Sequence, residues 1–216
     1  MRRRQIAVLF ALASIVSLIP LLLIACGDGG NDNPPTSTDG PRTTCKPAET
    51  VVPSTPGALP QGLAEYQSPE RGYRVEYPSD WGVKPNAVAV GNISGDAFFT
   101  GDATGKINPN VSVTCETVPI GTTSGDFIDA KRSVILNLIG KLPDIEKTLT
   151  VNGIEAASVK YDLQARQTPE PITMDKVEVY FADDMGGWTI AFTTPKGAID
   201  TYRAAFDSLV QSYHRP

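Results

Sequence analysis

Apolar and polar residues alternate along much of the chain after residue 62, which is the pattern of half-buried β-strands. The pattern is clearest at Tyr73–Tyr77, where two tyrosines and a valine alternate with Arg74 and Glu76. Pro78 ends this strand because proline cannot donate to a sheet ladder. Further strands are predicted at residues 87–90, 97–100, 111–118, 147–151, 154–163, 176–181 and 188–193. Asn152-Gly153 suits a type I′ turn, so it joins two of these strands in a hairpin.

Two other segments have apolar residues at helical spacing. The first starts at Thr123–Asp126, whose side chains can accept hydrogen bonds from free backbone N–H groups, and it ends at Gly140 and Pro143. Its stripe contains one polar residue, Lys131, and otherwise comprises Phe127, Ile128, Val134, Ile135, Leu138 and Ile139. The second segment covers residues 199–213. Each stripe marks the helix face that we expect to pack on the sheet.

The order of these elements predicts an α+β domain, because runs of strands interrupted by two helices are typical of a mainly antiparallel sheet. The domain covers residues 63–216, and a domain of about 150 residues can bury roughly two thirds of its surface. Trp81 and Trp188 are interpreted as core anchors, since an indole side chain needs an apolar interior.

The first 25 residues have the composition of a secretory signal peptide, with Arg2–Arg4 ahead of the apolar run Ile6–Ile24. The run ends in Leu23-Ile24-Ala25-Cys26, which resembles the lipobox of bacterial lipoproteins. The resemblance implies a diacylglyceryl group on the Cys26 sulfur and cleavage after Ala25. Two acyl chains anchor a protein stably to a membrane. The alternative is an uncleaved transmembrane helix, for which a run of roughly 20 residues is nearly long enough.

Residues 26–62 follow as a predicted tether that carries the lipidated cysteine. They are dominated by Gly, Asp, Asn, Pro, Ser and Thr, so they have little apolar surface to offset the entropy of ordering. A flexible chain of this length has a root-mean-square reach of roughly 35 Å. We expect the tether to hold the domain away from a membrane surface.

Two cysteines remain, Cys45 in the tether and Cys115 in the domain. Because exported compartments are often oxidising, the pair is a candidate disulfide. The alternative is that Cys115 is a buried free thiol, since it shares the inward side of its strand with Val111 and Val113. A bond would pin the tether to the domain and leave only the chain from Cys26 to Cys45 free.

The charge balance excludes some partners. Without the leader the chain has 16 basic and 24 acidic residues, which gives a net charge of −8. This balance argues against nucleic acid, which needs a basic face, and against electrostatic adhesion to anionic lipid.

Motifs for catalysis, cofactors or metals are weak. Gly101–Lys106 is one residue short of a phosphate-binding loop and lacks the Ser or Thr that should follow, and Ser94 is displaced from a nucleophile-elbow spacing. His214, the single histidine, is third from the end and is expected to be frayed, so a Ser-His-Asp triad is not predicted. Asp183-Asp184 lacks the spacing of a calcium loop and is interpreted as a turn. No catalytic residue, cofactor or metal site is therefore predicted.

Two stretches resemble a known fold family. Gly72–Trp81, an aromatic strand running into Pro-x-x-Trp, is similar to the opening strand of PsbP-like and DcrB-like domains. Trp188–Phe192 and Phe206–Tyr213 are similar to the final strand and helix of that fold. The resemblance covers roughly Tyr66 to Tyr213. It implies an α/β/α sandwich with a central antiparallel sheet, in non-enzymatic extracytoplasmic proteins, but function does not follow from the fold.

Two classes of function remain. The first is a non-catalytic binding or assembly module, outside the cytoplasm and lipid-anchored at Cys26, with a membrane or envelope protein as its partner. The second is a cell-envelope hydrolase that uses an unrecognised pair of carboxylates. Carboxyl groups with raised pKa values in a deep pocket would favour the hydrolase, whereas a shallow surface with an exposed apolar patch would favour the binding module. The loops Gly101–Asn110 and Ala165–Pro171 are the expected contact surfaces, because loops often carry binding.

Overall fold

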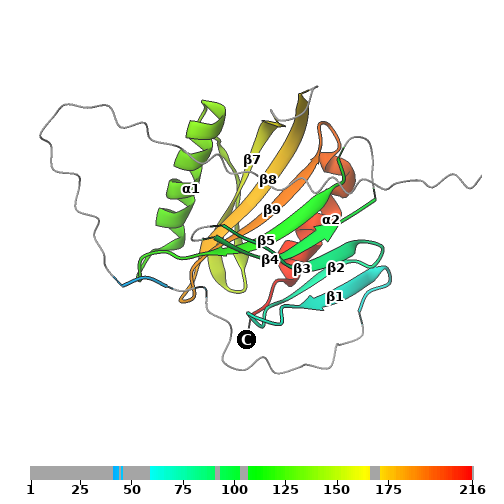
Figure 1. The fold of residues 1–216 in the computed structure, drawn as a ribbon, viewed down its shortest axis with the longest axis horizontal. Coiled ribbons are helices and arrows are strands. Elements are labelled where there is room, and N and C mark those ends of the chain that lie inside the picture. The colour runs from blue at the N-terminus through cyan, green and yellow to red at the C-terminus, as the bar shows by residue number, and fades with distance from the viewer. Residues whose placement is uncertain are drawn as a thin grey trace, which may run out of the picture. The chain divides into compact units, whose positions relative to one another are not determined.

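A computed structural model describes residues 41–43, 45, 59–90, 93–102, 107–165 and 171–215 (Figure 1). In these parts of the chain, no helix is long and apolar enough to cross a membrane. The elements, in chain order, are β1 (Leu63–Gln67), β2 (Arg74–Pro78), β3 (Gly82–Val90), β4 (Ile93–Thr100), β5 (Asn110–Glu116), α1 (Ser124–Ile139), β6 (Ile145–Val151), β7 (Ile154–Ala165), β8 (Ile172–Ala182), β9 (Gly187–Pro195) and α2 (Ile199–Ser212).

The main sheet has the strand order β3-β4-β5-β9-β8-β7-β6, and every pair in it is antiparallel. Its register aligns apolar residues in rows across neighbouring strands. Val113 of β5 lies opposite Ile190 of β9, which in turn lies opposite Val179 of β8. All three side chains are buried, so each row contributes to one continuous core. The sheet confirms the predicted α+β class.

The two helices pack on opposite faces of this sheet (Figure 1). On one face, α2 buries Phe206 and Leu209 against the larger core, which also contains both Trp188 and Trp81. On the other face, α1 packs over β7 and β8 in a smaller core. The prediction that the two tryptophans are core anchors is therefore confirmed.

The predicted strand at Tyr73–Tyr77 is confirmed, but it lies outside the main sheet. It forms β2, which pairs with β1 in a separate two-stranded sheet. The β1 strand was not predicted, because Leu63–Gln67 has little apolar alternation to identify it. This hairpin packs against α2, with the Glu76 N–H donating to the Ser212 hydroxyl over 2.7 Å.

A buried ion pair fastens the same hairpin to the main sheet. Pairing between β4 and β5 passes from Gly95 directly to Ala97, so Asp96 occupies a β-bulge. The bulge turns the Asp96 carboxylate inward, where its Oδ1 lies 2.6 Å from Nη1 of Arg71 in the loop between β1 and β2. Asp96 is 0% exposed and Arg71 is 3% exposed.

Three further expectations need correction. The strand predicted at 87–90 starts earlier, at Gly82, and it contains Pro85, which an edge strand tolerates. The next strand also starts earlier, at Ile93, so the turn between the two strands is shorter than expected. His214 is not frayed: its backbone N–H and C=O both pair with Arg74, over 2.9 and 2.7 Å. The type I′ turn at Asn152-Gly153 is confirmed by positive φ angles at both residues.

Candidate functional site

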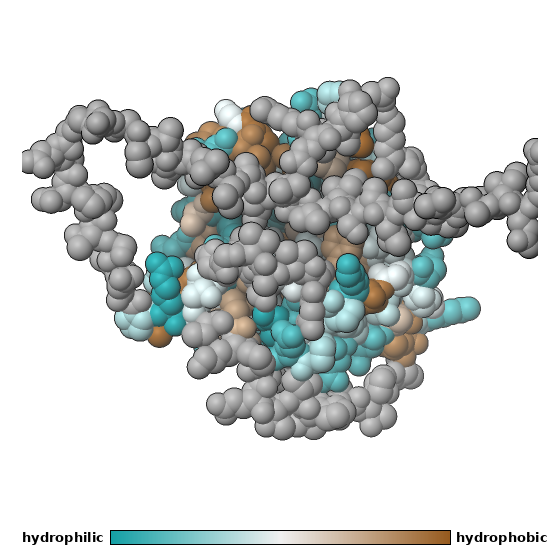
Figure 2. Space-filling view, viewed as in Figure 1, coloured by the Kyte–Doolittle hydropathy of each residue, from teal (hydrophilic) through white to brown (hydrophobic). Residues whose placement is uncertain are grey.

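The large hydrophobic side chains that are exposed in the described part of the chain all lie on α1 or next to its ends. Ile120 precedes the helix and is 64% exposed, and Val134 on the helix is 60% exposed. We call the whole set the α1 apolar cluster: Ile120, Val134, Leu136, Leu138, Leu142 and Ile145. Figure 2 shows hydrophobic surface at the upper left, over α1. Exposed apolar side chains on and near one helix are candidates for a contact surface.

This cluster corrects the sequence prediction for α1. Val134 and Leu138 were expected to face the sheet, but both are exposed. The helix packs mainly over β7 and β8, and its buried residues are Ser124, Phe127, Ile128 and Ile135. The apolar stripe is therefore wider than the surface available to cover it, and its excess faces outward.

The ends of α1 are fixed by local interactions. Thr123 is the N-cap: its hydroxyl accepts from the Asp126 N–H over 3.2 Å, and the Asp126 carboxylate accepts from the Thr123 N–H over 3.2 Å. These two bonds make a capping box. Gly140 closes the other end with a φ of 74°, a left-handed conformation that glycine adopts without strain. Both ends are where the sequence predicts them.

A shallow pocket of about 340 Å³ lies beside α1. It is formed by the helix, by the chain that follows β5, and by Arg42. Its lining residues are Arg42, Glu116, Thr117, Val118, Pro119, Thr122, Asp126, Phe127, Ala130, Lys131 and Val134. Val134 belongs both to the pocket and to the α1 apolar cluster, so the two features meet at this residue.

Lys131, the one polar residue in the apolar stripe of α1, lines this pocket and makes two contacts there. Its ammonium group pairs with the Glu116 carboxylate at the end of β5, and it also lies 5.1 Å from the centre of the Phe127 ring. The ammonium thus satisfies a partly buried carboxylate while it covers an aromatic face. The pair joins α1 to strand β5, whereas most of the helix packs over β7 and β8.

Close approach of α1 to the sheet depends on a glycine at the start of β9. A Cβ atom added to Gly187 would lie 2.3 Å from the Phe127 ring, far inside van der Waals contact. Phe127 therefore packs directly against the backbone of β9 and makes an edge-to-face contact with Tyr180 at 6.1 Å. Gly187 is required here for space.

Arg42, which lines the pocket, belongs to a segment that was expected to be part of the tether. We call it the strap: Pro41, Arg42, Thr43 and Cys45. The strap runs antiparallel to the chain after β5, with the Thr43 N–H donating to the Val118 carbonyl over 2.8 Å and the Ile120 N–H donating to the Pro41 carbonyl over 3.0 Å. The Thr43 hydroxyl also accepts from the Val118 N–H over 3.0 Å.

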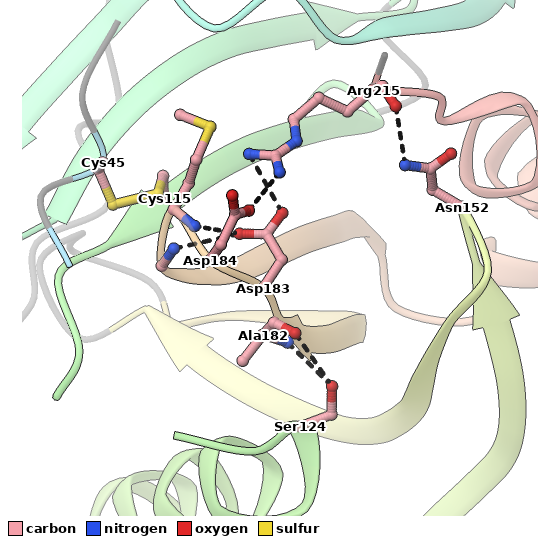
Figure 3. Close-up of polar contacts among 10 residues, drawn as sticks. Cys45, Cys115, Ser124, Asn152, Ala182, Asp183, Asp184 and Arg215 are labelled. Carbon is pink, nitrogen blue, oxygen red and sulfur yellow. Dashed lines mark hydrogen bonds and ion pairs between the residues drawn. A yellow bond between two sulfur atoms is a disulfide. The ribbon is translucent and has the colours of Figure 1, made fainter. Parts of the chain in front are cut away.

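A disulfide holds the strap in this position (Figure 3). It joins Cys45 to Cys115 of β5, with the two Cα atoms 5.8 Å apart. Both cysteines are buried, and the Cys45 N–H donates to the Met185 carbonyl over 3.1 Å. The next residue, Gly186, has no room for a side chain, because a Cβ atom there would lie 2.8 Å from the Cys45 sulfur.

Asp183 and Asp184, considered as calcium ligands from sequence, lie in the turn between β8 and β9 (Figure 3). The Asp183 Oδ1 accepts from the N–H groups of Met185 and Gly186 over 2.8 and 3.1 Å, which is a typical turn interaction. The Arg215 guanidinium pairs with both carboxylates. Within the described ranges, no three His, Cys, Asp or Glu side chains are arranged to hold a metal ion.

A buried carboxylate on the α1 face of the sheet has a displaced pKa. Glu178 of β8 accepts from the Tyr180 hydroxyl and pairs with Lys176 over 2.9 Å. Burial acts to raise its pKa, but Lys176, Tyr180 and Tyr161 more than offset burial, so the pKa of Glu178 lies below its ordinary value. The other carboxyl groups with a displaced pKa in the described residues are also lowered: Asp126, Glu146, Asp175 and Asp184.

Several sequence-predicted positions lie outside the described residues. Cys26 lies outside the described residues, and so do residues 103–106 and 166–170 of the two loops that we expected to make contacts. Sequence reasoning missed the exposed apolar side chains on α1. The sequence feature that could have indicated this exposure is the apolar stripe on both sides of Lys131, which is broad for a helix of this length.

No family model and no curated protein matches the chain. One similar solved structure is CyanoP, the cyanobacterial PsbP of Synechocystis sp. PCC 6803, with 14% identity over 76% of this chain and 99% of that chain, and a TM-score of 0.48.

Two other solved structures are similar to a comparable degree. One is a protein of unknown function from Pseudomonas aeruginosa, described as a putative regulator, with 15% identity over 69% of this chain and 94% of that chain, and a TM-score of 0.43. The other is LpqN of Mycobacterium tuberculosis, described as involved in cell envelope biogenesis, with 12% identity over 67% of this chain and 83% of that chain, and a TM-score of 0.44. At these values, no function is transferred to this chain.

Proposed function

We propose that this protein is an exported lipoprotein, anchored at Cys26, whose folded domain acts as a non-catalytic binding or assembly module at the membrane surface. Its docking surface is the α1 apolar cluster together with the adjacent pocket. Its partner is a component of the membrane or of the cell envelope. The anchor raises the local concentration of the domain near such a partner, so weak contacts are sufficient.

The observation that carries the proposal is the position of the exposed apolar side chains. They are confined to residues 120–145, whereas the rest of the described surface exposes no large hydrophobic side chain. Exposed apolar side chains concentrated in one region mark a candidate contact surface. The pocket beside them is open and shallow, which suits docking better than enclosure of a small substrate.

The charged groups support binding rather than turnover. At the pocket, Lys131 is paired with Glu116, and Asp126 is held in the capping box. The displaced carboxyl pKa values are lowered, and a general acid near neutral pH requires the opposite shift. The hydrolase considered from sequence therefore gains no support from the described residues.

Site-specific photo-crosslinking in cells tests the docking surface. A photoreactive phenylalanine at Val134 should form an adduct with an envelope component. The matched control is the same residue at Ala204, which is exposed on α2 in the opposite layer. Equal yields at the two positions would contradict a docking surface on α1, and turnover of an envelope substrate by the purified protein would contradict the non-catalytic proposal.

A further inference from the structure

One side of α1 carries a continuous row of exposed side chains. Residues four positions apart lie one above the other on a helix, so four of them form a row that we call the α1 ridge: Asp126, Ala130, Val134 and Leu138. All four residues are exposed, with Val134 at 60% and Leu138 at 42%. The first three also line the pocket, so the pocket lies along this side of the helix.

The α1 ridge matches a second copy of itself that runs in the opposite direction. Its N-terminal half has the small side chain of Ala130, whereas its C-terminal half has the larger Leu138. When two such helices pack antiparallel about an axis at Val134, Leu138 of each copy lies opposite Ala130 of the other. Both positions are four residues from Val134, so the match of a small with a large side chain is made twice.

The charges at the two ends of α1 are matched in the same arrangement. Asp126 is the acidic residue of the first turn, the last turn has no basic residue, and Lys141 follows the Gly140 C-cap. In the antiparallel pair, the exposed Lys141 of each copy lies near Asp126 of the other, where opposite charges attract. The positive N-terminal end of each helix dipole also lies beside the negative C-terminal end of the other. A parallel pair would bring like charges together instead.

Packing geometry favours this side of α1. Ridges of residues four apart fit into the grooves of a facing helix, and the small Ala130 side chain leaves room for a close approach. The pocket adds depth beside Ala130, so Leu138 of a second copy has a recess to enter. Leu136 projects from a different side of the helix, because two residues correspond to a rotation of about 200°.

We propose that the α1 ridge is a homodimer interface, through which two copies of this chain pack antiparallel about a two-fold axis at Val134. The inference rests on the proposed function, because it names the occupant of the same docking surface: a second copy of the anchored lipoprotein. An interface about a two-fold axis is self-complementary, so each copy supplies both the pocket and the side chain that enters it.

Cysteine cross-linking in membranes of cells that produce the full chain tests the interface. The anchor proposed at Cys26 and the Cys45–Cys115 disulfide occupy the native cysteines, so Val134→Cys adds one free thiol. Oxidation with copper phenanthroline should link these chains into a covalent dimer on a non-reducing gel. The matched control is Leu136→Cys, on the same helix and 39% exposed, which should form several-fold less dimer.

Two more cysteine variants test the direction of packing. Positions 130 of the two copies are about 12 Å apart along the helix axes, because each lies four residues from the two-fold axis and each residue adds 1.5 Å. Ala130→Cys and Leu138→Cys should therefore form little dimer when each is produced alone. When both are produced in the same cells, they should link to each other.

Sedimentation in detergent measures the same interface without a cross-link. Leu138→Asp places a charge in the contact, so the mature variant should sediment as a monomer, whereas wild type and Leu136→Asp should sediment as dimers. Both leucines are exposed, so both variants should keep the wild-type melting temperature. A Leu138→Asp variant that stays dimeric would overturn the proposed interface.

The outcomes separate this inference from the proposed function. Equal cross-linking at positions 134 and 136, or Ala130→Cys linking to itself as readily as to Leu138→Cys, would overturn the antiparallel dimer. If photoreactive phenylalanine at Val134 forms its adduct with another envelope protein or with lipid, the docking surface stands and the homodimer falls. If neither an adduct nor a cross-link forms at position 134, both proposals fall.

Discussion

Removal of the Asp96 carboxylate should destabilise the domain strongly. Asp96 and Arg71 are 0% and 3% exposed, and their nearest oxygen and nitrogen atoms are 2.6 Å apart. Arg71 lies in the loop between β1 and β2, where its N–H also donates to the Ser68 hydroxyl over 3.0 Å. In Asp96→Ala the guanidinium therefore stays near the core without its principal counter-charge.

The expected magnitude follows from this burial. Breaking a buried ion pair by removing one partner typically costs about 3–5 kcal/mol, because the remaining charge is poorly solvated. Removal of both charges should cost less, so Asp96→Leu/Arg71→Leu should be more stable than Asp96→Ala. An exposed pair provides the control: the Asp129 carboxylate is 77% exposed and lies 3.5 Å from Arg132. Asp129→Ala should change stability by less than about 1 kcal/mol.

Equilibrium unfolding in urea measures these differences. The midpoint for Asp96→Ala should fall well below the wild-type midpoint with little change in the m-value, and Asp129→Ala should match the wild type. If Asp96→Ala lies within about 1 kcal/mol of wild type, the pair does not contribute to stability as a buried charge interaction.

Other substitutions test other parts of the structure. Trp81→Ala should cost about 3–5 kcal/mol in the same urea assay, because the indole is 9% exposed and packs against Tyr202, and a neutral result would place Trp81 at the surface. Thr123→Ala should lower stability by about 1 kcal/mol through loss of the cap on α1, and an unchanged melting temperature would reject the capping box. The folded-state pKa of Glu178 is lowered, so its ionised carboxylate stabilises the fold. This stabilisation is present above the ordinary glutamate pKa of about 4.3, and it is lost as pH falls through the folded-state pKa. Stability measured between about pH 5 and pH 2 should therefore fall less steeply in Glu178→Gln, and an identical slope would mean that this carboxylate does not favour its charged form in the fold.

The regular parts of the fold were predictable from sequence because their signals are local. Residues 111–116 alternate strictly, Asn152-Gly153 identifies its turn, and Thr123 with Gly140 marks the ends of α1. Each of these depends on backbone preferences within a few residues. The helices, the antiparallel sheet and the core tryptophans follow from such patterns.

The parts that were missed depend on tertiary contacts. Asp96 faces inward only because a bulge shifts the register of β4, and Arg71 meets it across 25 positions of sequence. The exposure of Val134 and Leu138 depends on how much of the sheet α1 covers, which helical spacing does not report. The strap likewise gains its position from β5 and not from its own polar composition.

The intact mass of the mature protein, extracted from membranes under non-reducing conditions, tests the central claim most directly. The claim is that a folded domain is tied by a disulfide strap to a lipid anchor. The account predicts a chain that begins at a diacylglyceryl-modified Cys26 and has two hydrogens fewer than the dithiol form, with the peptides of Cys45 and Cys115 recovered as one linked pair. A mass that begins at another residue, or free thiols at both positions, would contradict it.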